Sequence, residues 1–375
     1  MTVAREITDR KKYTPRIWRD GTRAGVVSWR GGARWLLLTL VAIALPAADA
    51  EAQRLTVRYG SKVPADVKLI YERGLAYLAE TQTDNGSWDG GNFSTGGQAG
   101  ITGMCCMVFM ASGEDPNFGR YSHHVRRAVK SLILSQDPNT GYLPDSMYHH
   151  GFGTLGLSEV YGAVDDSLIW DGSEPRGRRR SIGQALDLAV RCAVTSQKKN
   201  RWGGWRYSPD DNGADTSVSG AVLVGLLAAR NAGIEVPDEV TEKALNYFRS
   251  STGKTGMVAY SGGVGGFGES MNRSAIATLV YSIGKKKDWP EFSATLEHIT
   301  SRLEHRENSY PFYFRYYMAQ ALFQGDFESW QKWNRETIRL LKDRQREDGS
   351  FSSGHGNTYG TEMSLLALAL NYRKV

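Results

Sequence analysis

The chain has 375 residues, of which 41% are hydrophobic and 23% are charged, a composition typical of a globular protein and not of a disordered chain or a coiled coil. Its 42 glycines exceed the usual share, but the 11 prolines follow no Gly-X-Y period, which excludes collagen. The net charge of +6 equals the surplus of basic over acidic residues within residues 1–34, so the rest of the chain carries no net charge. We therefore expect no nucleic-acid partner.

The N-terminal region is typical of an export signal. Basic residues precede an apolar run at 35–45, and Ala48-Asp49-Ala50 and Ala50-Glu51-Ala52 offer small-X-small cleavage sites. The run is shorter than the about 20 apolar residues that a spanning helix needs, so no stable transmembrane anchor is expected. The sequence predicts cleavage near Ala50 or Ala52 and export to the periplasm or the medium. An anchor formed by an uncleaved signal is the alternative, and a start codon downstream of Met1 stays open.

One sequence motif repeats through the rest of the chain: a helix that ends in Gln, a short turn, a glycine and an aromatic residue. The most complete copy is Arg73-Gly74-x2-Tyr77-Leu78-x3-Gln82-x3-Gly86-x-Trp88. The anchor residues of the recognisable copies are Gln82, Gln136, Gln197, Thr252 and Gln345. The spacing between the last two anchor residues, Thr252 and Gln345, is nearly twice the other spacings, and a degenerate copy fits between them at 297–310. Six copies of roughly 50 residues each indicate a repeat architecture.

Each copy predicts two helices, the first charged on one face and the second apolar nearly all round. The first helices are expected at 67–80, 125–135, 182–196, 239–249, 292–305 and 327–344, and the second at 99–111, 153–164, 216–231, 272–283, 314–323 and 360–372. A helix that is apolar on every side must be buried on every side. We therefore predict an all-α protein, an (α/α)6 toroid of six hairpins with inner and outer helix rings. Residues 1–52 form the basic region and signal, 53–65 a linker, and 66–375 a single toroid domain.

The first copy of the motif resembles the QW repeat of the prenyltransferase and squalene-oxidase-repeat superfamily. Squalene–hopene cyclases and protein prenyltransferase β subunits belong to this superfamily. The resemblance extends over about residues 66–375. It implies an (α/α) toroid whose central cavity binds an apolar, isoprenoid-like ligand. The Gln and Trp residues of the motif are expected to serve the fold.

The site is expected at the cavity mouth where the inner helices begin, because six helix N-termini converge there after Gly-rich loops. Aromatic residues with a few polar groups suit a hydrophobic ligand or a carbocation. The expected ligand-binding residues are His149, His150, Trp202, Trp205, Tyr207, Glu269, Arg273, Arg315, Tyr359 and Glu362.

The segment 202–217 resembles class II terpene cyclases, in which an Asp-x-Asp-Asp-Thr motif heads the matching inner helix and its third residue is the general acid. Aligned on Asp-Thr, this chain has Asn212-Gly213-Ala214-Asp215-Thr216, so Ala214 stands in the position of the acid. Asp215 is the one match, and Asp210 and Asp211 lie nearby in another register. These three aspartates are the candidate catalytic residues, and Asp215 is also expected to cap its helix.

No metal and no cofactor is predicted. The protein prenyltransferases bind zinc through an Asp, a Cys and a His, but Cys105 and Cys106 fall inside the first inner helix and Cys192 lies on an outer helix. The sequence does not determine the oligomeric state or whether the protein is an enzyme.

Two further functions compete with an isoprenoid ligand. A polysaccharide lyase or hydrolase would use Trp202, Trp205 and Tyr207 to stack on sugars. Asp210, Asp211, Asp215 or Glu269 would then act as acid or base, and Arg273 or Arg315 would pair with uronate carboxylates. The second alternative is a non-catalytic scaffold that binds a partner protein.

Overall fold

The computed structural model describes residues 63–90, 99–172, 174–261 and 270–372. These residues form twelve α-helices, three short 3-10 helices and one isolated β-bridge, between Thr252 and Val258. The predicted signal and cleavage region and the predicted site residue Glu269 lie outside the described residues.

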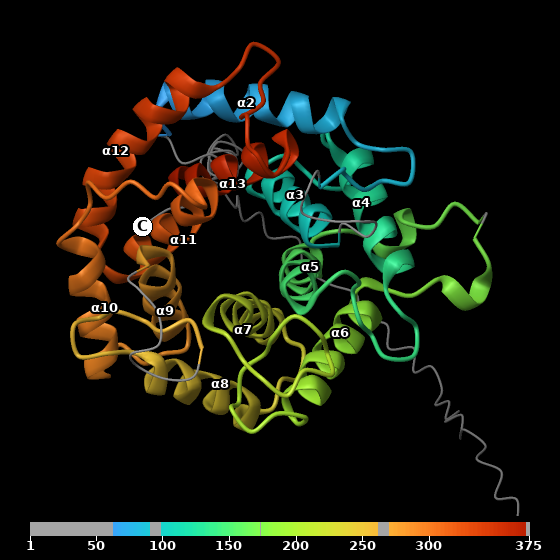
Figure 1. Ribbon diagram of the computed structural model, residues 1–375. Helices are drawn as coiled ribbons and strands as arrows, with labels where there is room; N and C mark the ends of the chain where they lie inside the picture. The colour runs from blue at the N-terminus through green and yellow to red at the C-terminus, as the bar shows by residue number, and fades with distance from the viewer. Residues whose placement is uncertain (1–62, 91–98, 173, 262–269, 373–375) are drawn as a thin grey trace, which may run out of the picture. The chain divides into compact units, whose positions relative to one another are not determined.

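The helices alternate between two concentric rings (Figure 1). The outer ring consists of α2 (Ala65–Glu80), α4 (Ser122–Ser135), α6 (Ile182–Gln197), α8 (Asp238–Ser251), α10 (Pro290–Thr300) and α12 (Phe327–Arg344). The inner ring consists of α3 (Ala99–Ala111), α5 (Met147–Val160), α7 (Thr216–Asn231), α9 (Met271–Ile283), α11 (Pro311–Gly325) and α13 (Asn357–Ala369). Each inner helix packs against the next and α13 returns to α3, while α12 contacts α2. The predicted all-α (α/α)6 toroid is confirmed.

Glycines in the inner ring allow three helices to approach closely. A Cβ atom on Gly103 of α3 would lie 2.6 Å from the carbonyl oxygen of Phe152, and one on Gly151 of α5 would lie 2.8 Å from that of Ala221. The prediction that the second inner helix begins at 153 is wrong, because α5 already begins at Met147. The glycines at this end of α5 are packing positions in the helix and do not form a loop.

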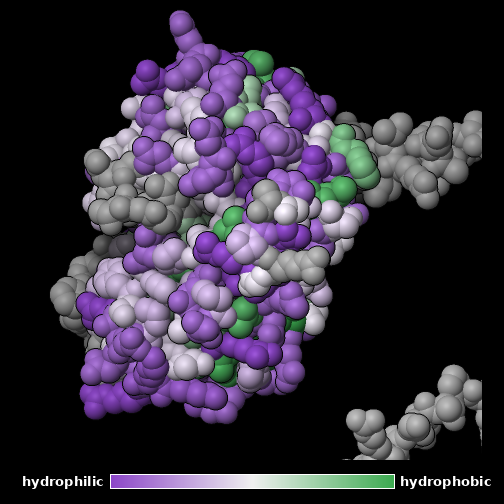
Figure 2. Space-filling view, turned by 90° about the vertical axis from the view of Figure 1, so that its right-hand side faces the viewer, coloured by the Kyte–Doolittle hydropathy of each residue, from purple (hydrophilic) through white to green (hydrophobic). Residues whose placement is uncertain are grey.

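The outer helices are amphipathic, as expected for a layer between core and solvent. On α12, Trp330, Trp333 and Leu341 are buried, whereas Lys332 and Arg339 on its other face form exposed ion pairs within the helix. Figure 2 shows that the side of the molecule over α4 and α6 is mainly hydrophilic, with small separate apolar patches.

The glutamine of the repeated motif joins one hairpin to the next. The Nε2 atom of Gln82 donates to the carbonyl of Gly86 in its own turn and to that of His124 in α4, both at 2.9 Å. The same pair of bonds runs from Gln136 to Gly141 and Ala185, from Gln197 to Gly203 and Val240, and from Gln345 to Gly349 and Ile70. Four of the six junctions between hairpins therefore share one side-chain bridge.

The glycine and the tryptophan of the motif also stabilise the fold. Gly349 has φ +84°, and a Cβ atom there would lie 2.2 Å from the carbonyl oxygen of Arg73. Trp88 and Trp205 are fully buried, and their Nε1 atoms donate to the carbonyls of Leu78 and Ala193 at 2.7 and 2.8 Å. The turn thus packs against the next outer helix while the indole ties it back to the preceding one.

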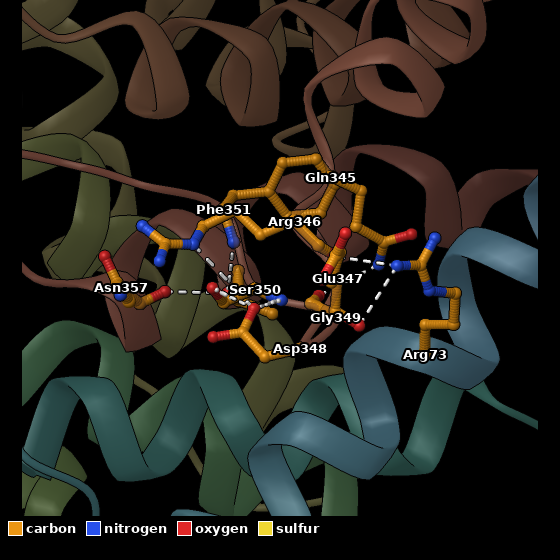
Figure 3. A network of polar contacts seen from close by, with 10 residues as sticks. Arg73, Gln345, Arg346, Glu347, Asp348, Gly349, Ser350, Phe351 and Asn357 are labelled. Atoms are coloured by element: carbon orange, nitrogen blue, oxygen red, sulfur yellow. Dashed lines mark hydrogen bonds and ion pairs between the residues drawn. The ribbon is translucent and has the colours of Figure 1, made fainter.

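The last hairpin closes onto the first through the same contacts (Figure 3). Gln345 reaches Ile70 across 275 residues of sequence. In return, Nη2 of Arg73 on α2 donates to the carbonyls of Arg346 and Glu347 at 2.7 and 3.2 Å. An ion pair between Lys342 and Asp66, at 2.8 Å, lies beside them.

Replacing Gln345 by alanine tests this closure. The variant leaves the carbonyls of Ile70 and Gly349 without their donor, so we expect the free energy of unfolding to fall by about 1–2 kcal/mol in urea titrations. Gln331→Ala, at an exposed position of α12, is the matched control and should change it by less than about 0.5 kcal/mol. Equal stability of the two variants would contradict the closing role of Gln345.

Candidate functional site

A cavity of about 650 Å³ lies among the N-terminal ends of the inner helices. Five inner helices or the loops before them supply its lining: Asp145, Ser146, Tyr148, His149, Tyr207, Ser217, Val218, Tyr260, Ser270, Asn272, Arg273, Tyr310, Tyr313 and Tyr359. Six of these fourteen side chains are tyrosines, and Val218 is the single aliphatic one. The described lining is therefore aromatic and rich in hydroxyl groups.

His149 lies in the first turn of α5, where Ser146 caps the helix. The Ser146 Oγ atom accepts from the backbone N–H of His149 and lies 3.2 Å from its Nδ1. Burial lowers the pKa of His149, and the nearby Asp145 carboxylate acts in the opposite direction. The imidazole is consequently neutral near pH 7 and able to accept a proton. Asp145 itself has φ +90°, a strained backbone conformation for a residue with a side chain.

Two tyrosines from neighbouring loops meet at the rim of the cavity. The hydroxyl groups of Tyr207 and Tyr260 lie 2.5 Å apart, and Tyr207 is half exposed. The guanidinium of Arg206 stands 5.9 Å from the centre of the Tyr207 ring. Burial, followed by the hydrogen bond from Tyr207, raises the pKa of Tyr260. The Tyr260 phenol therefore keeps its proton at neutral pH.

A cluster of aromatic rings forms the wall between α5 and α11. The rings of Tyr148 and Tyr313 have centroids 5.9 Å apart, and Tyr148 also meets Phe152 edge to face at 4.9 Å. Tyr313 in turn lies 4.7 Å from Tyr317. Burial raises the pKa of Tyr148, Tyr313 and Tyr317, so their hydroxyl groups stay protonated.

Arg273 and Asn272 place a cation and a buried amide in the first turn of α9. Arg273 is half buried, and burial lowers its pKa, but a guanidinium keeps its charge in any protein environment. Within the described lining, Arg273 supplies the permanent positive charge and Asp145 the single carboxylate.

Asp215 caps α7 behind the cavity wall. Its Oδ1 atom accepts from the backbone N–H of Val218 at 2.9 Å, whereas Oδ2 is buried without a hydrogen-bond donor. Burial raises the pKa of Asp215 from 3.8 to about 6. Its charge also raises the pKa of Tyr260 and Tyr313, both of which line the cavity. The expected capping role of Asp215 is confirmed.

The other two candidate catalytic aspartates lie in the turn that leads to α7. Asp210 is exposed and forms an ion pair with Lys199, and Asp211 accepts from the backbone N–H of Ser208 at 2.7 Å. Both carboxylates stabilise this surface turn, and neither lines the cavity. The expectation that they act at the site is not supported by their position.

Four predicted ligand-binding residues line the cavity: His149, Tyr207, Arg273 and Tyr359. Three others lie elsewhere for clear physical reasons. His150 is fully buried, where its Nδ1 accepts from Leu143 and its Nε2 lies 3.0 Å from the carbonyl of Ala189. Trp205 is the buried repeat tryptophan described above. Trp202 is exposed and lines a separate hollow of about 440 Å³ with Lys198 and Arg201.

Glu362 and Arg315 are buried, but neither is part of the described lining. The Oε2 atom of Glu362 accepts from the thiol of Cys105 at 3.2 Å, and burial raises the pKa of Glu362. This pair therefore joins α13 to α3 as a neutral contact in the core.

The cavity residues that were not predicted from the sequence include Asp145, Ser217, Asn272 and Tyr313. Asp145 and Tyr313 were missed because the starts of α5 and α11 were predicted too late. Two start signals could have corrected this, since Ser146 is a favourable N-cap residue and Pro311 occupies the first position of α11.

Two features are absent among the described residues. No group of three or more His, Cys, Asp or Glu side chains gathers in a way that could hold a metal ion. No helix among these residues combines the length and the apolar character needed to cross a membrane.

Solved structures similar to this chain include members of two classes of enzyme. An inactive variant of the α-1,6-mannanase GH76A of Salegentibacter sp. HEL1_6, in complex with α-1,6-mannotriose, has a TM-score of 0.61 at 9% identity and covers 82% of this chain and 99% of its own. A variant of the type II terpene cyclase MstE from Scytonema, in complex with geranylgeranyl dihydroxybenzoate, has a TM-score of 0.55 at 14% identity, with 82% and 97% covered. No protein-family model and no curated protein matches the sequence. The similarity establishes the toroid fold that this chain shares with both enzymes.

The raised pKa of Asp215 predicts a stability difference that depends on pH. Asp215→Asn keeps an oxygen that can cap α7 but cannot ionise. Because the folded protein binds this proton more tightly than the unfolded chain, the wild type loses stability relative to the variant as the pH rises from about 4 to about 6, by about 2–3 kcal/mol in total. Urea unfolding across this range measures the difference. A difference that does not change with pH would show that Asp215 ionises as an ordinary aspartate.

Proposed function

We propose that the central cavity binds an acidic oligosaccharide and cleaves it by β-elimination, the lyase form of the polysaccharide alternative. The observation that carries this proposal is the described lining: hydroxyl-bearing tyrosines, one guanidinium and a neutral histidine, with a single aliphatic side chain.

The lining contains groups that can bind the rings and the carboxylate of a sugar acid. Tyrosine rings stack on the apolar faces of pyranose rings, and their hydroxyl groups bond to sugar hydroxyls. Arg273 can pair with a uronate carboxylate through two parallel hydrogen bonds. The buried amide of Asn272 adds a donor beside it. A purely apolar ligand would leave the buried Oδ1 atom of Asn272 without a hydrogen-bond partner, which is unfavourable.

The same residues supply the groups that elimination requires. His149 accepts the proton at C5 of the uronate, and Arg273 stabilises the negative charge that then develops on the carboxylate. The electron pair of the C5–H bond forms the C4=C5 double bond as the C4–O4 bond breaks. The Tyr207–Tyr260 pair gives a proton to the leaving oxygen. Atoms and charge balance without a cofactor.

The carboxylates favour elimination over hydrolysis. Most glycoside hydrolases need two carboxyl groups that face the scissile bond. Asp145 is the single carboxylate of the described lining. Asp210 and Asp211 lie outside it, and Glu269 lies beyond the described residues. The proposal includes export by the N-terminal signal, which would bring the protein to polysaccharides outside the cell.

Two substitutions test binding and chemistry separately. Arg273→Gln should weaken binding of an oligouronate by at least about tenfold and leave a neutral mannooligosaccharide unaffected, since only the charge pairing is lost. His149→Gln should keep binding but reduce turnover by about 100-fold or more. Calorimetry measures the first effect, and ultraviolet absorbance of the unsaturated product the second. Arg339→Gln, on the outer face of α12, is the control for both.

The proposal fails if wild-type protein binds no oligouronate, or if it binds neutral and acidic oligosaccharides equally well. If the wild type and His149→Gln both bind an oligouronate but neither forms an unsaturated product, the proposed ligand class is supported and the proposed elimination reaction is wrong.

A second candidate function is the binding and protonation of an isoprenoid, which Asp215 favours. Its buried carboxyl group has an unpartnered Oδ2, stays largely protonated below about pH 6, and heads the inner helix that carries the acidic motif in the cyclases it resembles. Polyprenyl substrates incubated with wild type and Asp215→Asn separate the two functions. Cyclised product that disappears in the variant would favour the isoprenoid, whereas binding of neither ligand class would favour a scaffold.

A further inference from the structure

The turn of the third repeat copy differs from the other turns in its length and in one side chain. Gly203 follows Gln197 by six positions, whereas the glycine follows the anchor residue by five positions in the second copy and by four in the copies anchored at 82, 252 and 345. Trp202 stands directly before this glycine. The other recognisable copies have a polar residue there: Asn85, Thr140, Thr255 and Asp348. The repeat therefore does not need an aromatic residue at this position.

The side chain of Asn200 holds the turn and so fixes the position of Trp202. Its Oδ1 atom accepts from the backbone N–H groups of Trp202 and Gly203 at 3.0 and 3.1 Å. Its Nδ2 atom donates to the carbonyl of Gly204 at 2.8 Å. Trp205 is fully buried, whereas Trp202 is 43% exposed. The fold thus uses the second tryptophan of this segment and presents the first to solvent.

Trp202 lines a hollow of about 440 Å³ between this turn and α8. At two other junctions, an arginine of the next outer helix lies against the glycine of the turn and donates to the backbone of that turn, as Arg73 and Arg127 do. Lys243 has the matching position on α8, but its ammonium pairs with Glu239 of its own helix. This contact therefore does not join the turn to the helix, and a hollow remains between them.

The described residues that line the hollow include cations and amides but no carboxylate. Lys198 and Arg201 supply positive charge, and the guanidinium carbon of Arg201 lies 5.0 Å from the centre of the Trp202 ring. Asn246 of α8 adds an exposed amide. An indole can stack on the apolar face of a sugar ring, and a guanidinium can pair with a carboxylate through two hydrogen bonds. The volume also lies within the range of small-molecule sites, about 300–1,000 Å³.

The segment that lines the hollow continues to the rim of the central cavity. Tyr207 follows Trp202 by five positions, so their Cα atoms lie at most about 18 Å apart. Tyr207 is also half exposed, and Arg206 stands beside its ring. Two exposed aromatic rings, each next to an arginine, therefore lie on one short segment, the first at the hollow and the second at the cavity.

We propose that the hollow is a second binding site for an acidic polysaccharide and holds the polymer while another part of the same polymer enters the central cavity. This inference rests on the ligand class of the proposed function and not on the elimination reaction. Two linked sites bind a polymer more tightly than either site alone, because the second contact is intramolecular. A nucleic acid would need a longer basic surface, and the chain after residue 34 carries no net charge.

Affinity electrophoresis of the purified full chain, in gels that contain polygalacturonate or alginate, tests the inference. Trp202→Asn introduces the residue that the first copy has at this position, so the fold should be kept and the midpoint of thermal unfolding should not change. The dissociation constant for the polymer that the wild type binds more tightly should rise at least about tenfold. Trp202→Tyr keeps an aromatic ring and should restore most of the affinity. Phe118→Ala removes an exposed ring from another loop and should have no effect.

The two cations are tested in the same gels. Lys198→Gln and Arg201→Gln should each raise the dissociation constant for the polymer several-fold at low salt, and by less at high salt, because salt screens exposed charges. Arg339→Gln, at an exposed arginine that pairs with Glu336, is the matched control.

A trisaccharide of the same uronate separates the two sites in calorimetry. Arg273→Gln should weaken its binding in the central cavity, whereas Trp202→Asn should change it by less than about twofold. If polymer binding depends on Trp202 but no unsaturated product forms, the second site is supported and the proposed reaction is wrong. The inference is overturned if the wild type binds neither polymer, or if Trp202→Asn binds the polymer like the wild type. Tighter binding of oligothymidylate than of both polymers would also overturn it.

Discussion

The toroid depends on one short-range interaction, the two hydrogen bonds donated by a glutamine amide at the end of an outer helix. One bond closes the turn in its own repeat, and the other reaches a carbonyl near the start of the next outer helix. Because both acceptors are backbone groups, this side chain sets the position of one hairpin relative to the next. Repeated around the ring, the same geometry brings Gln345 back to Ile70, and the chain closes without exposed end repeats.

Closure also determines the chemistry of the cavity. Alternation of the two rings brings the starts of the inner helices to one mouth, so residues from five of them share a small volume. Removal from water then acts on each group according to its charge: it makes His149 a weaker acceptor of protons, and it makes Tyr260 and Asp215 weaker acids. A neutral base and a protonated phenol can therefore exist in one cavity near pH 7. The same fold serves a mannanase and a terpene cyclase, so these side chains, and not the fold, must distinguish the substrate.

The departures from the repeat are as informative as its regularity. At the fifth copy, the glutamine and the glycine are both lost, and the buried Arg315 lies near the start of the following inner helix, α11. A closed ring tolerates one altered junction because its neighbours hold both sides of it.

The sequence alone determined the all-α toroid, its six hairpins and the structural roles of Gln and Trp, because these rest on local periodicity and on a turn that repeats. It also placed His149, Tyr207, Arg273 and Tyr359 at the cavity, since they lie at or near the starts of inner helices. Tertiary structure decided the rest. His150 differs from His149 by one position, but a rotation of about 100° per residue directs it to the backbone of α6. Asp210 and Asp215 are both acids beside α7, but only packing around the closed ring shows which one is removed from water.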